Sequence, residues 1–365
     1  MHTLCRASAV PLYYGFVPYE LSINRTDRER AGTLSLESGM RTAEEKAALL
    51  RQHEEEKNDN AYPTFLYRQK RAGKHIIVSL DIIGRSGSIA DALLVTVILH
   101  TLRESGVEKP FLRVNSVGDR ESFMRFSREF TLFSRKHGND LPPTCRERIY
   151  LEHQGTNRAC THDACEAFRR DAPTPLEFLN EAARAHFKEV LEYAETLSLP
   201  YILHERLAGP TNICSHTVFR IDNETGETLA SGFRYNTLAR RLGFRREIPA
   251  IGAEIRIAGE GAESTLNKPP APGAYFIHLG HRARLQGLRI LETLRQAHIT
   301  THHSLTNEKL SVQMSHADTL HTPYLIIVGH KEAVEGTALI RDRERSFQEI
   351  LPQSALPIRL AHLLR

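Results

Sequence analysis

Apolar and polar residues alternate around a turn in the second half of the chain. Residues 217–221 alternate, an Asn- and Gly-containing stretch follows at 222–226, and the chain returns through 228–236. Period-two alternation on both sides of such a turn predicts an antiparallel hairpin. A short helical run at 237–242 and an apolar segment at 248–253 come next. This part of the chain is therefore predicted to form an antiparallel sheet.

Helical periodicity is prominent before the hairpin. Apolar residues at helical spacing, or runs rich in Ala, Glu, Lys and Leu, predict four helices, at 42–58, 89–105, 120–136 and 177–197. We expect the first of these to be solvated and capped by Thr42, with Glu45 three residues later. Short apolar runs predict strands at 111–114 and 201–203.

The pattern changes after a Pro-rich stretch at 266–273, which has the composition of a linker. Beyond it, strands and helices alternate, with strands predicted at 275–279, 299–303 and 324–328 and helices at 282–297 and 308–320. This order is typical of a small α/β domain with parallel strands. We therefore expect two domains, residues 1–265, with a helical insertion at about 140–200, and residues 272–365.

Composition excludes some classes of protein. The chain has 365 residues, a net charge of +4 and 41% hydrophobic residues, which is ordinary for a globular protein. No apolar run approaches the roughly 18 residues that span a bilayer, and no signal-peptide pattern is found at the N-terminus. Five cysteines, an odd number, favour reduced thiols in the cytoplasm. We expect a cytoplasmic protein with neither a membrane nor DNA as its partner.

Several short motifs occur in a specific order along the chain. They are Asn115-Ser116-Val117-Gly118, Thr217-Val218-Phe219, Ser231-Gly232-Phe233-Arg234-Tyr235-Asn236, Pro249-Ala250-Ile251-Gly252 and, near the C-terminus, Glu335-Gly336-Thr337-Ala338 with Arg341-Asp342. Together they resemble histidyl-tRNA synthetase, a class II aminoacyl-tRNA synthetase. The resemblance implies an α/β fold, more closely an α+β class II antiparallel sheet core with helices, followed by a small α/β anticodon-binding-like domain. It also implies tRNA as a partner.

The residues that carry the family's chemistry are replaced. Aligned without gaps on Thr217, the family's catalytic arginine falls on Gly209 and its aspartate on Asn212. The two tyrosines of that motif fall on Ile213 and Cys214, and the final arginine, which would hold ATP, falls on Gly259. The resemblance therefore implies a kept architecture with a dismantled active site, and we assign no catalytic residue.

Four residues remain candidates for substrate binding if that ability is retained: Arg68, Asn212, Arg234 and Tyr235. The fork of the Arg68 guanidinium suits phosphate oxygens, although Arg68 also fits a surface arginine at the end of a basic strand. Arg234 and Tyr235 match the family's pocket but also suit a strand end packed under a helix. No cofactor is certain; ATP with Mg would be needed if the chain is active.

Three functional hypotheses follow. The first is a synthetase-like protein that lacks aminoacylation activity and acts in tRNA or partner binding or regulation. The loss of a single charge-assisted contact to a developing oxyanion costs on the order of 3 kcal/mol, and two arginines are missing. The second is a divergent, active histidine–tRNA ligase. The third is the same fold used for another acyl-adenylate chemistry.

The partner protein is also left open by the sequence. The strand of the first class II motif is matched only loosely at residues 13–20, and the long helix expected before it is almost absent. Because that helix and strand build the family's dimer interface, the homodimer is in doubt. A synthetase or a biosynthetic enzyme is the other partner we consider.

A Cys-x-His-x-x-Cys group lies at Cys160, His162 and Cys165. Zinc sites need four ligands, and only Cys145 is available as a fourth. The resembling family binds no metal through this segment. We therefore expect ordinary thiols and no metal site here.

Overall fold

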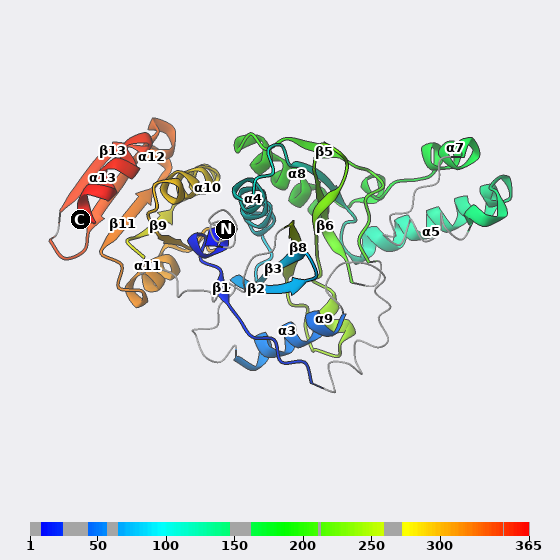
Figure 1. The fold of residues 1–365 in the computed structure, drawn as a ribbon, viewed down its shortest axis with the longest axis horizontal. Helices are drawn as coiled ribbons and strands as arrows, with labels where there is room; N and C mark the ends of the chain where they lie inside the picture. The colour runs from blue at the N-terminus through cyan, green and yellow to red at the C-terminus, as the bar shows by residue number, and fades with distance from the viewer. Residues whose placement is uncertain are drawn as a thin grey trace.

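The computed structural model describes residues 9–24, 43–56, 65–146, 162–210, 213–258, 272–345 and 347–364. Within these residues the strands form two sheets, one of eight strands and one of five. In Figure 1 the smaller sheet and its helices lie on one side of the large sheet, and α5 and α7 extend from the other side. None of the helices in the described ranges is long and apolar enough to cross a membrane.

The large sheet is mostly antiparallel, as predicted. Its strand order is β1-β2-β3-β8-β7-β6-β4-β5, and among the described strands of this sheet only the β1–β2 and β4–β5 pairs are parallel. The strands are β1 (Val17–Pro18), β2 (Phe65–Ala72), β3 (His75–Ile83), β4 (Phe111–Ser116), β5 (Tyr201–Leu203), β6 (Ser215–Asp222), β7 (Thr228–Arg234) and β8 (Ala250–Ala258). The predicted hairpin is confirmed as the β6–β7 pair.

One face of the large sheet packs against α4 (Ile89–Glu104) and α8 (Glu181–Thr196). Val78 and Leu80 of β3 and Ile251 of β8 lie in the same buried cluster as the apolar residues of α4. Nearly the whole of α4 is buried, because it lies between the large sheet and the helices of the smaller unit. The helix predicted at 89–105 is confirmed.

The other face of the large sheet packs against α3 (Ala43–Glu56) and α9 (Leu238–Arg241). The expectation that the first helix is solvated is wrong, since Lys46, Leu49 and Leu50 are buried. Its charged residues can be buried because they pair with carboxylates and cations of the sheet. Thr42, its predicted cap, lies outside the described residues.

A helical arm extends from the large sheet (Figure 1). It consists of α5 (Arg120–His137), η1 (Gly138–Asp140), α7 (Asp163–Asp171) and η2 (Pro175–Phe178). The single helix predicted at 177–197 is divided into η2 and α8. The division falls at Asn180, whose side chain accepts a hydrogen bond from the Ala183 backbone N–H at 2.9 Å and so starts α8.

The smaller sheet has the strand order β10-β9-β11-β12-β13. The elements are β9 (Ala274–His278), α10 (His281–Gln296), β10 (Thr301–His303), α11 (Leu310–Thr319), β11 (Tyr324–Val328), α12 (His330–Glu335), β12 (Thr337–Asp342), β13 (Gln348–Pro352), η3 (Gln353–Ala355) and α13 (Leu356–Leu363). The parallel prediction holds for β9, β10 and β11, whereas β12 and β13 are antiparallel. Gly336, with φ of 69°, ends α12 in the left-handed conformation, and the chain then returns beside β11. The predicted linker lies mostly outside the described residues.

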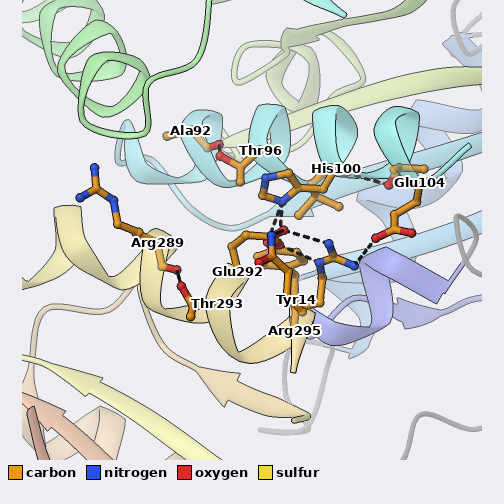
Figure 2. Close-up of polar contacts among 12 residues, drawn as sticks. Tyr14, Ala92, Thr96, His100, Glu104, Arg289, Glu292, Thr293 and Arg295 are labelled. Atoms are coloured by element: carbon orange, nitrogen blue, oxygen red, sulfur yellow. Dashed lines mark hydrogen bonds and ion pairs between the residues drawn. The ribbon is translucent and has the colours of Figure 1, made fainter. Parts of the chain in front are cut away.

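A cluster of polar side chains joins α4, which covers the large sheet, to α10 of the smaller unit (Figure 2). Glu292 of α10 accepts from Tyr14 at 2.6 Å and from Arg295 at 2.6 Å, and it lies 3.0 Å from Nδ1 of His100 on α4. Arg295 also reaches Glu104 of α4 at 3.0 Å. Burial opposes ionisation of Glu292, but hydrogen bonds from Arg295 and His100 outweigh it and hold the pKa of the carboxyl well below its usual range. The smaller unit is therefore docked through a charged network.

Candidate functional site

A row of polar residues crosses the large sheet on the face that α3 covers. Arg68, Ser79, Glu254, Ser231 and Arg220 are successive register partners on β2, β3, β8, β7 and β6. Register partners on neighbouring strands point to the same face of a sheet. The five side chains therefore form one polar row on a single face.

The cations of this row, and Arg113 beside Arg220 on β4, are neutralised by carboxylates of the same chain. Arg68 Nη2 lies 2.6 Å from Glu45 Oε1 on α3. Arg220 Nε lies 3.0 Å from Asp222 Oδ1, and Arg113 Nε lies 2.7 Å from Asp222 Oδ2. The polar row thus offers little uncompensated positive charge to an anion.

A buried ion pair occupies the sheet next to this row. Lys46 Nζ of α3 lies 2.6 Å from Asp81 Oδ1 of β3, and the Tyr235 hydroxyl donates to the same oxygen at 2.7 Å. The ammonium also lies 4.4 Å from the centroid of the Tyr235 ring, within the range of a cation–π contact. All three residues are buried.

The ion pair lies directly on the backbone of Gly252. A Cβ atom at this position would be 2.0 Å from Asp81 Oδ1 and 2.4 Å from Lys46 Nζ. Any other residue would therefore collide with the pair. The hollow that a glycine leaves above the sheet is filled here by the Lys46 ammonium and the Asp81 carboxylate.

Arg234 is fully buried on the opposite face, against α4. Its Nη2 lies 2.6 Å from Asp91 Oδ2, and the guanidinium also donates to the backbone oxygens of Arg85 at 3.0 Å and Gly87 at 2.7 Å. Burial opposes ionisation of Asp91, but the charge of Arg234 outweighs it and holds the pKa of the carboxyl well below its usual range. Each guanidinium nitrogen thus donates to a protein oxygen.

A cavity of about 620 Å³ lies where β6 and β7 meet α5. Its lining mixes cations, acids and small polar groups, and consists of Asp119, Arg120, Glu121, Met124, Arg125, Arg128, Ser215, His216, Asn236, Thr237 and Glu247. Burial, with the neighbouring His186 and Arg234, lowers the pKa of His216 to about 4. His216 is therefore neutral near pH 7, and the three arginines of α5 are the cations of this cavity.

Known proteins are similar to this chain in both sequence and fold. A family model described as an anticodon binding domain matches residues 274–361. The chain is 28% identical over 295 residues to a histidine–tRNA ligase of Rubrobacter xylanophilus, covering 77% of this chain and 67% of that protein. It is 26% identical over 319 residues to the enzyme of Geobacillus kaustophilus, covering 83% and 72%.

The fold agrees with these relatives. The apo histidyl-tRNA synthetase of S. aureus superposes with a TM-score of 0.51 at 20% identity, covering 98% of this chain and 94% of that one. The chain is histidyl-tRNA synthetase-like. Its large sheet corresponds to the class II core, and residues 274–361 correspond to the anticodon-binding domain.

The candidate residues of this synthetase-like chain are divided between the two sheet faces. Arg68 and Tyr235 lie on the α3 side, where Glu45 and Asp81 contact them. Arg234 lies on the α4 side. Asn212 is outside the described residues, as is Gly259.

Gly209 packs closely against Cys214. A Cβ atom there would lie 2.7 Å from Sγ of Cys214 and 3.0 Å from its Cβ. Cys214 is itself buried in the apolar cluster under α3 and α9. A side chain at the position aligned with the family's catalytic arginine would thus require Cys214 to move.

Sequence reasoning did not find Lys46, Asp81 or Glu45 as residues of this site. A signal was present, because Asp81 lies between Leu80 and Ile82 in a mostly apolar run. A buried acid in such a strand requires a partner, but the sequence could not say that the partner is a lysine of α3.

The structure brings Cys145, His162 and Cys165 together in the helical arm, with their ligand atoms within 4.8 Å of one another. Cys160, the remaining member of the sequence motif, lies outside the described residues.

Proposed function

We propose that this chain is a synthetase-like binding protein that does not form histidyl-tRNA and acts by binding tRNA or a partner protein. The observation that carries the proposal is the Lys46–Asp81 pair, which fills the hollow above Gly252 and engages the Tyr235 hydroxyl. An amino acid bound at this place would have to displace a buried ammonium and leave Asp81 without it. Breaking a buried ion pair in this way costs about 3–5 kcal/mol.

The described residues of this site also lack free positive charges of the kind that amino-acid activation needs. Adenylate formation develops negative charge on phosphate, and enzymes stabilise it with preorganised cations. Gly209 stands where the family has an arginine, and a side chain there would collide with Cys214 in its present position. Arg68 lies on the face of the large sheet that α3 covers, but its guanidinium is paired with Glu45.

The C-terminal sheet offers a surface suited to RNA. One face of this sheet is covered by α11, which packs over Tyr275, Ile277 and Leu325. The same face continues onto β12 and β13, where Leu339 pairs with Ile350 and Arg341 pairs with Gln348.

Part of this face is exposed. Ile350 is 61% exposed and Arg341 is exposed beside it. A cation for phosphate next to an apolar surface for bases is the combination that single-stranded RNA loops require. In this proposal residues 272–365 form the RNA-binding domain, and residues 1–265, with the helical insertion at about 140–200, form the synthetase-like domain.

The proposal is tested by binding and charging of tRNA by the same full-length protein. We expect fluorescence anisotropy to show tRNA binding that weakens with salt, while no histidyl-tRNA accumulates in the presence of ATP, Mg²⁺ and histidine. Arg341→Glu should weaken binding and lower the slope of log K against log salt by about one or more. Lys188→Glu, at an exposed lysine of α8, is the control that should leave binding nearly unchanged.

A divergent active ligase is the second candidate. It is favoured by Arg68, whose side chain keeps 21% of its accessible surface on the polar row. Formation of histidyl-tRNA that stops in an Arg68→Ala variant would establish it and overturn the proposal above. Charging with an amino acid other than histidine would instead indicate another acyl-adenylate chemistry.

A further inference from the structure

The helical arm has a small core of its own. Its buried residues are mainly aromatic and sulfur-containing, and comprise Phe126, Phe130, Leu141, Cys145, Cys165, Phe168 and Ala172. In Figure 1 this arm extends away from the large sheet. A core of this size supplies little stability, and small folded units often add a metal or a disulfide for this reason.

Three metal-binding side chains meet at the edge of this core. Sγ of Cys145 lies 3.4 Å from Nδ1 of His162, and the ligand atoms of Cys145, His162 and Cys165 are all within 4.8 Å of one another. In a tetrahedral zinc site with Zn–S of about 2.3 Å and Zn–N of about 2.0 Å, ligand atoms are about 3.5–3.8 Å apart. The observed arrangement is close to this spacing before any metal is added.

The local backbone places the His162 and Cys165 side chains close together. His162 is the N-cap of α7 in an extended conformation, and Cys165 lies three residues later in the first turn. The Cys165 backbone N–H donates to the His162 carbonyl oxygen at 2.8 Å, which holds both side chains at the same end of the helix.

Cys145 approaches from a separate segment. Its backbone N–H donates to the Pro142 carbonyl oxygen at 2.8 Å, at the start of a helical segment that follows η1. Cys145 and His162 are 17 positions apart in the chain. A metal bound by both would close this length of chain and hold α7 against the segment after α5.

We propose that Cys145, His162 and Cys165 bind one zinc ion, which replaces the expectation of ordinary thiols. Two thiolates and an imidazole are soft and borderline ligands that select zinc over magnesium or calcium. The two sulfur atoms belong to buried residues while His162 is exposed, so the ion can enter from solvent on the histidine side. Within the described residues, these side chains supply three of the four ligands that zinc needs.

The role of this ion is structural. The site lies in the core of the helical arm, and the energy of zinc binding becomes folding energy when the ligands come from separate segments. The arm includes α5, which supplies Arg120, Arg125 and Arg128 to the cavity beside β6. Zinc would therefore fix the position of these arginines.

Metal content and cobalt spectroscopy of the full-length reduced protein test the proposal. After reconstitution with excess zinc and desalting, we expect one zinc per chain by mass spectrometry. With Co²⁺ in place of zinc, the visible bands of tetrahedral cobalt and a thiolate-to-cobalt charge-transfer band should appear. Cys145→Ser and Cys165→Ser should lose both the ion and the charge-transfer band. Cys214→Ser, at a buried cysteine outside the arm, should keep them.

His162→Ala separates metal binding from folding, because His162 is exposed and its loss leaves the core of the arm intact. We expect this variant to stay folded by circular dichroism yet lose the zinc on desalting. A wild-type protein that retains no zinc would overturn the proposal. So would zinc that persists in all three ligand variants, since that ion would be bound adventitiously by other histidines.

Discussion

At the scale of single residues, the buried charge of Lys46 is the feature on which the proposed lack of aminoacylation activity depends. Lys46 lies on a helix face with Ala47, Leu49 and Leu50, and its ammonium is buried against Asp81. A buried ion pair contributes little net stability compared with apolar residues, but removal of one partner leaves an uncompensated charge. Both partners must therefore stay in place to avoid an unpaired buried charge, and together they fill the hollow above Gly252.

Lys46→Met should lower the free energy of unfolding by about 3–5 kcal/mol, because Asp81 is then buried without its cation. Urea denaturation measures this change. Lys331→Met, at an exposed lysine of α12, should change stability by less than about 0.5 kcal/mol. The double variant Lys46→Met, Asp81→Asn should lose less than the sum of the two single variants; strict additivity would show that the pair is not coupled.

At the scale of elements, the ends of α5 and α8 depend on each other. Asn180 caps α8, and its amide nitrogen donates to Asp119 Oδ2 at 2.7 Å. Asp119 in turn caps α5 by accepting from the Ser122 backbone N–H at 2.9 Å. One asparagine therefore joins the start of two helices on which the cavity beside β6 depends.

Asn180→Ala should destabilise the protein by about 1–2 kcal/mol, since it removes a helix cap and the partner of a second cap. Thermal unfolding is the measurement, with Lys188→Ala on the same helix as the control. An unchanged midpoint in Asn180→Ala would mean that water replaces both hydrogen bonds without loss.

Most elements could be predicted from local pattern, whereas the site could not. The helix at 89–105 and the hairpin at 217–236 follow from spacing and turn residues, which are local properties. The burial of α3 was missed because its charges are neutralised by Asp81 and by Arg68, which lie far away in the sequence. The antiparallel strands β12 and β13 were likewise missed, since their pairing is decided by β11 rather than by their own residues.

At the scale of the whole molecule, His303 of β10 lies where the smaller unit meets the N-terminal segment. It is buried, its Nε2 donates to the Tyr14 carbonyl oxygen at 3.1 Å, and its ring centroid lies 5.8 Å from that of Phe65 in β2. Burial, with the neighbouring His302, lowers the pKa of His303 to about 3. The contact therefore requires neutral histidine.

Stability should fall as the pH drops below about 6.5, because the unfolded chain then binds a proton that folded His303 does not accept until about pH 3. For this one residue the loss between pH 7 and pH 5 is about 2 kcal/mol. Urea denaturation across this range measures it. His303→Gln should show a shallower dependence on pH than the wild type; an equal slope would assign the effect to other groups, such as His216.

The measurement that tests the central claim most directly is ATP–pyrophosphate exchange by the full-length protein, with and without histidine. A filled hollow above Gly252 and the absence of a cation at Gly209 predict no histidine-dependent exchange from folded protein that still binds tRNA. Histidine-dependent exchange at a rate well above that without histidine would contradict the account. It would mean that the Lys46–Asp81 pair opens to admit the amino acid and that other residues supply the missing charge.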